Sequence, residues 1–317
     1  MAYLIDISTD ISGLQATLQQ VYDTMIVHCQ ELIGISSAIA GFGTLLHVGS
    51  NIWMQISSGK GEVNIEPLYR PLAIGMAIAF FPYVIALING VMQPTVTGTA
   101  ALVNDSNQAI STLLQEKEQA LQQSTDWQMY TGTSGSGNID KWEQLSGDAD
   151  SGVLSGVSNR VKFEMAKASY NLKNSVKVWL SEILQVLFEA AALCINTVRT
   201  FYLIILAILG PLAFAFSVYR GLEDSLSHWL SQYLHVFLWL PVANIFGSLI
   251  GQIQQEMIKL DIAQLNATGQ TTFGSTDAAY IIFLLMSIVG YFTVPSISHA
   301  IIRTGGMGAK LWRTKLT

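Results

Sequence analysis

Charged residues are scarce in this sequence. Asp, Glu, Lys and Arg make up 12% of the 317 residues, whereas they make up about a quarter of an ordinary soluble domain. Hydrophobic residues make up 50%, and the mean hydropathy is +0.41. The formal net charge of −6 also excludes the excess of basic residues with which a chain binds nucleic acid through bulk electrostatics.

Cysteines and catalytic motifs are equally rare. The two cysteines, Cys29 and Cys194, lie far apart and belong to no redox motif. The motifs GxSxG, HExxH and CxxC do not occur, and residues 305–310 lack the GxxxxGK(S/T) spacing of a phosphate-binding loop. His228 and His235 share a helix face without a tight ligand motif. We therefore expect no enzymatic activity, no cofactor and no bound metal.

Five long apolar stretches without charge are present instead. A helix needs about 20 apolar residues to cross the hydrocarbon core of a bilayer. Residues 201–209 are apolar on every face, which favours helices over the alternating strands of a membrane barrel. The expected fold class is all-α: a polytopic membrane helical bundle of about five transmembrane helices. These are predicted over residues 33–56, 71–92, 190–218 (with its beginning between 180 and 190), 227–251 and 279–302.

The remaining residues form an N-terminal helix, a long external segment and a basic tail. The external segment contains a loop rich in Gly, Ser and Asp between Thr131 and Ser158, and a helical pattern resumes from about Arg160. The expected organisation is an external amphipathic helix (1–31), two transmembrane helices (32–104), a periplasmic excursion (105–177), three further transmembrane helices (178–302) and a cytoplasmic tail (303–317).

The distribution of basic residues predicts the orientation. Residues 303–317 carry four basic residues and no acid, whereas residues 1–31 carry four acids and no base. Because basic residues accumulate on the cytoplasmic side, we expect the C-terminus in the cytoplasm and the N-terminus in the periplasm of the bacterial inner membrane. Lys173 and Lys177, just before the third predicted span, count mildly against this orientation. The first residues lack the basic region of a cleavable signal peptide.

The N-terminal helix has an apolar face at three- and four-residue steps. Thr9 or Asp10 is its expected cap. Two interpretations stay open: the helix lies at the membrane surface or packs on the bundle, or it binds a partner. The apolar face consists of Ile11, Leu14, Leu18, Val21, Met25 and Leu32.

Prolines and small residues are expected to shape the helix packing. A proline inside a helix removes one backbone donor and clashes with the preceding turn, so each should kink its span. Such kinks serve packing alone or let the helices splay around a central opening. Gly247 and Gly251 form a GxxxG pair, which predicts close helix contact. The prolines in the predicted spans are Pro82, Pro211, Pro241 and Pro295.

A polar stripe precedes and enters the third span. Polar groups at membrane depth usually face a bundle interior or an aqueous cavity. The stripe therefore predicts a pore or subunit interface, unless the helix begins well outside the bilayer and its acids lie in solvent. Its members follow steps of three and four and share one helix face: Glu182, Gln185, Glu189, Asn196 and Arg199.

The sequence resembles the TraJ proteins of Bacteroidetes conjugative transposons. Residues 210–252 and 280–308 carry the clearest resemblance, and the N-terminal half agrees in Tyr-Asp-x-Met-x-x-x-Cys at 22–29 and in PLYRPLAIG at 67–75. The resemblance covers nearly the whole chain and includes no mechanistic motif. The motif positions expected to matter structurally are Gly210, Pro211, Trp239, Leu240, Pro241, Gly305, Gly306 and Gly308.

The resemblance implies a TrbL-like polytopic inner-membrane subunit of a type IV secretion system. Such a subunit would form an oligomeric platform or translocation path, with a pentamer expected from related systems. Its implied partners are membrane lipid, stalk or pilus subunits, secretion ATPases and a translocated DNA–protein substrate. Two alternatives stay open: a secondary transporter, for which no internal repeat is visible, and a structural scaffold that docks secretion ATPases without lining a channel.

Overall fold

The computed structural model describes residues 13–14, 17–57, 66–133, 135–146, 153–269 and 275–302. These residues form helices joined by turns and short connections, and they include no strand. The expected all-α class is therefore confirmed for this part of the chain. The expected cap at Thr9 or Asp10, the basic tail and the motif positions Gly305, Gly306 and Gly308 lie outside the described residues.

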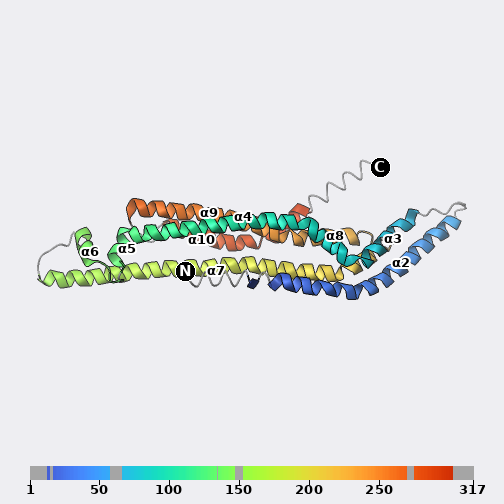
Figure 1. Ribbon diagram of the computed structural model, residues 1–317, viewed down its shortest axis with the longest axis horizontal. Helices are drawn as coiled ribbons and strands as arrows, with labels where there is room; N and C mark the ends of the chain where they lie inside the picture. The colour runs from blue at the N-terminus through green and yellow to red at the C-terminus, as the bar shows by residue number, and fades with distance from the viewer. Residues whose placement is uncertain are drawn as a thin grey trace. The chain divides into compact units, whose positions relative to one another are not determined.

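The helices follow one another along the chain as Figure 1 labels them. The first runs from Thr17 to Ser57 and contains the short 3₁₀ turn η1 (Ile26–His28) before α2 (Cys29–Ser57). The next are α3 (Glu66–Ala79), α4 (Phe81–Gln123), α5 (Thr125–Tyr130), α6 (Ile139–Ser146), α7 (Val153–Phe216), α8 (Ser225–Phe237), α9 (Trp239–Thr268) and α10 (Ser275–Tyr291), and a last helix covers Val294–Ile302.

Three of these helices are long and apolar enough to cross a membrane. They are Thr17–Ser57, Val157–Phe216 and Ser225–Thr268. Two bent pairs bring the number to five if each counts as one span: Tyr69–Ala79 with Phe81–Gln123, bent by 84°, and Ala278–Tyr291 with Val294–Ile302, bent by 47°. These candidates overlap the five predicted stretches. Three to five apolar helices of this length suggest a membrane protein.

The four prolines differ in what surrounds them. Pro82 and Pro295 are each the second residue of a helix that follows one of the two large bends. Pro241 is the third residue of α9, after the single-residue break at Leu238. At these three positions the missing N–H costs little, because the first turn of a helix has no internal acceptor for it. Pro211 instead lies inside α7, which continues to Phe216.

The N-terminal helix buries a residue outside its expected apolar face. Leu14, Val21 and Met25 are exposed, whereas Tyr22 is only 8% exposed. Ile11 lies outside the described residues. The helix continues into the first candidate span after the turn at Ile26–His28, without a break at residues 31–32.

The chain divides into two compact units. The first unit contains Ala100–Ala191 and Asn244–Gly290, and the second contains Ala2–Thr99, Ala192–Ala243 and Tyr291–Thr317. In the first unit, Tyr130 of α5 stacks on Tyr170 of α7, with ring centroids 4.8 Å apart, and Phe163 is buried beside it. Aromatic rings in such offset contacts contribute beyond their buried area. This cluster fixes α5 against α7.

The second unit has an aromatic core of its own. Phe81 of α4 meets Phe214 of α7 edge to face at 5.4 Å between ring centroids, and Trp229 of α8 lies 5.7 Å from Phe81. The Trp229 indole N–H donates to the carbonyl of Leu206, 2.9 Å away. The bulky side chains thereby join α4, α7 and α8 while the one polar group among them has a partner.

Candidate functional site: a buried polar cluster

Three polar side chains form a closed hydrogen-bonded triangle in the second unit. The hydroxyls of Tyr22 and Tyr233 lie 2.8 Å apart, and each lies 2.9 Å from the side-chain amide of Asn89. Tyr233 is fully buried and Tyr22 is 8% exposed. The triangle joins the N-terminal helix, α4 and α8, which are far apart in sequence.

The geometry fixes the direction of all three hydrogen bonds. The Asn89 amide nitrogen donates to the Tyr22 oxygen, and the Tyr233 hydroxyl donates to the Asn89 oxygen. Since the single Tyr233 proton is then used, the Tyr22 hydroxyl donates to Tyr233. Every member donates once and accepts once, so the triangle is satisfied without water.

Arg199 of α7 is the buried charge of the second unit. It is 8% exposed, and its guanidinium carbon lies 5.2 Å from the centroid of the Phe237 ring. Its Nε donates to the Phe237 carbonyl at 3.3 Å. Among the described residues no carboxylate lies within ion-pair distance of it. An arginine stays protonated, so it is held by a ring face and a backbone dipole.

The carbonyl that Arg199 contacts is available because of a proline. In a continuous α-helix the carbonyl of Phe237 would accept from the N–H four residues later. That residue is Pro241, which has no N–H. The Arg199 side chain supplies a donor at the break between α8 and α9.

His235 lies at the same break and contacts the last helix. Its Nε2 is 3.0 Å from the Pro295 carbonyl, and its own carbonyl accepts from the Ser298 hydroxyl at 2.6 Å. Donation to Pro295 requires a proton on Nε2, so the Trp239 indole N–H, 3.3 Å from the same nitrogen, cannot also donate to it. The two bonds at 3.0 and 2.6 Å therefore join α8 to Val294–Ile302.

The predicted polar stripe is divided between the two units. In the first, the Gln185 amide donates to the Glu189 carboxylate at 3.1 Å, and Glu182 is half-buried. In the second, Arg199 faces α8, and the buried side-chain oxygen of Asn196 has no hydrogen-bond partner among the described residues. The role of the stripe as a pore or subunit interface stays a prediction.

Two glycines lie where a side chain would not fit. A β-carbon at Gly210 would overlap the Phe81 ring, and one at Gly251 would overlap the Ser106 hydroxyl of α4. Gly247 is half-buried, and so is Leu240, whereas Pro211, Trp239 and Pro241 are buried. Small residues allow helices to approach closely. In this protein they do so within single units.

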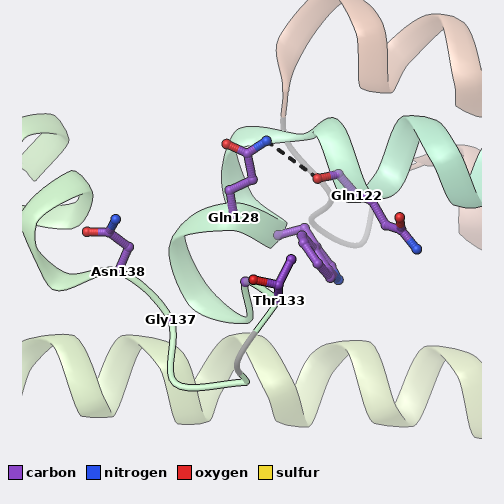
Figure 2. A pocket seen from close by; sticks show the side chains of 7 residues that line it. Gln122, Gln128, Thr133, Gly137 and Asn138 are labelled. Atoms are coloured by element: carbon purple, nitrogen blue, oxygen red, sulfur yellow. Dashed lines mark hydrogen bonds between the residues drawn. The ribbon is translucent and has the colours of Figure 1, made fainter.

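The first unit holds a polar hollow of about 320 Å³. Figure 2 shows the Gln128 amide reaching the Gln122 carbonyl at its edge. Gln128 also accepts from the Lys141 ammonium, and Asn138 caps α6 by accepting from the Lys141 N–H. Because these side chains are already engaged with one another, the hollow offers few free donors to a ligand. It is lined by Gln122, Trp127, Gln128, Gly132, Thr133, Gly137 and Asn138.

No candidate metal site appears within the described ranges, where no three His, Cys, Asp or Glu side chains converge. The members of the triangle were not singled out from sequence. Asn89 was the available signal, since it is a lone amide inside an apolar predicted span. Tyr22 opens the motif at 22–29, but nothing in its spacing indicates a contact with Tyr233.

The helices and their buried polar cluster define an all-helical protein with three to five candidate membrane spans. The chain belongs to the family of homologues of TraJ from Bacteroides conjugative transposon, whose model matches residues 9–316. The expected family is thus confirmed, and membership implies a role in conjugative transfer. A search of curated proteins finds no match.

Proposed function

We propose that this protein is an inner-membrane subunit of a conjugative type IV secretion system. It forms an oligomeric platform or translocation path at the base of the stalk or pilus, in the manner of TrbL-like subunits, and it catalyses no reaction. The observation that carries the proposal is the family match over residues 9–316. The three to five apolar helices support the membrane location.

The buried cluster supports a structural role in the membrane. Arg199, Asn89 and Tyr233 meet their partners inside one chain, which is how polar groups at membrane depth are tolerated. They fasten the breaks of α8 and the N-terminal helix to one another. A rigid bundle of this kind suits a platform on which other subunits assemble.

The partners follow from the proposed place in the machine. Copies of this chain, stalk or pilus subunits on the periplasmic side and secretion ATPases on the cytoplasmic side would surround it, and the translocated DNA–protein substrate would pass through or beside it. The proposed orientation has the N-terminus in the periplasm and the C-terminus in the cytoplasm. Alkaline phosphatase and fluorescent-protein fusions at the two ends test this orientation.

The function is tested by deletion and complementation in the native donor. Deleting the gene should abolish transfer of the transposon, and the plasmid-borne wild-type gene should restore it. The restored protein should sediment with inner membranes and stay there after a carbonate wash. Transfer that persists without the gene, or a protein that remains in the supernatant, would overturn the proposal.

A second experiment separates a translocation path from the alternatives. Formaldehyde treatment during mating, followed by denaturing purification of the tagged protein, should recover transposon DNA from wild-type donors. Donors that lack the secretion ATPase serve as the control, because substrate does not enter their machine. Absence of DNA in both donors favours a scaffold, and solute uptake by liposomes containing only this protein favours a transporter.

A further inference from the structure

Helix α7 is too long to lie wholly within a bilayer. Its 64 residues extend about 96 Å at about 1.5 Å per residue, roughly three times the thickness of a hydrocarbon core of about 30 Å. All its charged residues except Arg199 precede residue 190. The first half of α7 therefore projects into water, and the charge-free residues 200–216 lie in lipid.

The projecting half has two apolar faces. One is buried in the first unit, where Phe163 and Tyr170 contact α5. The other is exposed, and its residues recur at steps of four, four and three over residues 157–190. We call it the exposed α7 stripe. It consists of Val157, Val161, Met165, Ala168, Leu172, Val176, Trp179, Ile183, Leu187 and Ala190.

The exposed α7 stripe is large for a surface that meets only water. Leu172 is 67% exposed and Met165 is 70% exposed. With a length of about 50 Å and a width of about 10 Å, the stripe covers on the order of 500 Å². Contiguous apolar patches above a few hundred Å² usually mark interaction sites.

The repeat of the stripe matches a second copy of itself. Three steps add to eleven residues, which is about 3.67 residues per turn and close to the natural period of an α-helix. A stripe with this period stays on one side of a nearly straight helix for its whole length. A second helix with the same repeat can therefore pack along all of it.

The charges beside the stripe favour a parallel arrangement. Lys162 and Lys173 follow Val161 and Leu172 on one flank. The other flank carries Glu164 and Glu182 together with Arg160. In parallel helix pairs, opposite flanks face each other, so lysines meet glutamates, whereas in antiparallel pairs like flanks meet. Copies inserted into one membrane with the same sidedness also present α7 in parallel.

We propose that the exposed α7 stripe is the surface through which copies of this chain associate, packed parallel and in register outside the membrane. The inference deepens the proposed function, on whose oligomeric platform it rests, by naming the surface that builds the oligomer. Figure 1 shows the corresponding part of α7 in yellow-green. Packing of this kind would bury the apolar residues that the single chain leaves exposed.

Cysteine cross-linking of the full-length protein in its native membrane tests the proposal. In a background with Cys29→Ala and Cys194→Ala, single cysteines replace Val161, Leu172 or Ile183, which are eleven residues apart and occupy one position of the repeat. Each should give a disulfide-linked band at twice the 34.6 kDa of the monomer. An antiparallel pair would give the band at one of these positions at most.

Asn174→Cys is the matched control. Asn174 is exposed and lies two residues after Leu172, on the opposite side of α7. It should give no dimer band under the same oxidation. Equal cross-linking of L172C and N174C, or none at any stripe position, would overturn the proposal.

A charge on the stripe gives an independent readout. Leu172→Glu should shift the detergent-purified protein to the monomer mass in sedimentation experiments, whereas Asn174→Glu should leave the oligomer intact. An oligomer unchanged by L172E would show that lipid or another protein covers the stripe. If transfer by the wild-type gene is restored in that case, only this surface is withdrawn, whereas failure of wild-type complementation withdraws the proposed function.

Discussion

Arg199 and Pro241 are coupled through one backbone carbonyl. Pro241 cannot donate to the carbonyl of Phe237, and the Arg199 Nε donates to it instead at 3.3 Å. The arginine contributes a donor where α8 gives way to α9. This relationship ties a charged residue of the predicted stripe to a proline of the family motif.

The coupling predicts a non-additive double mutant. Arg199→Met should leave the Phe237 carbonyl without its donor and destabilise the protein by about 1–3 kcal/mol. Pro241→Ala restores a backbone N–H four residues after Phe237, so the double variant should lose less stability than the sum of the single changes. Thermal unfolding in detergent, followed by circular dichroism, measures all four proteins. Strict additivity would show that the two residues do not share the carbonyl.

The hydrogen-bonded triangle predicts a cost for losing a single hydroxyl. Tyr233→Phe should leave the buried Asn89 oxygen without its donor and destabilise the protein by about 1–3 kcal/mol. Tyr83→Phe, at a tyrosine that is 74% exposed, is the matched control and should change little. The comparison uses the unfolding midpoint of each purified variant. Equal midpoints for Y233F and the wild type would remove the triangle from the account of stability.

The contact between Gly210 and Phe81 predicts a steric cost. Gly210→Ala places a methyl group against the Phe81 ring, and overpacking of this kind costs about 1–3 kcal/mol. Phe81→Leu should partly relieve the clash in the double variant. Gly90→Ala, where no atom lies within 4 Å of the added carbon, should be neutral or slightly stabilising. A midpoint for G210A as high as that of G90A contradicts the close contact.

The ion pair between Arg70 and Glu223 predicts a dependence on pH. The Arg70 guanidinium, 2.7 Å from the Glu223 carboxylate, lowers the pKa of Glu223 through its hydrogen bond and its charge. Because the folded-state pKa is below the unfolded one, the stabilisation is complete above the unfolded value and is lost as pH falls through the folded value.

The test compares Glu223→Gln with the wild type. The wild type should unfold at a slightly higher temperature at neutral pH, and the difference should shrink as the pH is lowered below about 4. Both side chains are half-exposed, so added salt should also reduce the difference. A gap between the two proteins that stays constant from neutral to acidic pH would contradict the assigned pKa direction.

The expected site residues show where reasoning from sequence stops. Arg199 was placed on a polar helix face from its spacing alone, and its burial could not be foreseen because the partner, Phe237, is 38 residues away. Asn89 and Tyr22 are 67 residues apart. No periodicity connects such positions, because each belongs to a different helix whose rotation is set by packing.

The sequence by itself determined the helical class and the positions of the apolar stretches, because hydrophobic length and the helical period are local properties. It also carried the family motifs. Only the tertiary structure decided that Pro82 follows an 84° bend while Pro211 lies inside a continuous helix, and that Tyr22, Asn89 and Tyr233 share hydrogen bonds. Those features depend on which helix faces meet, and the meeting of faces is decided by side chains far apart along the chain.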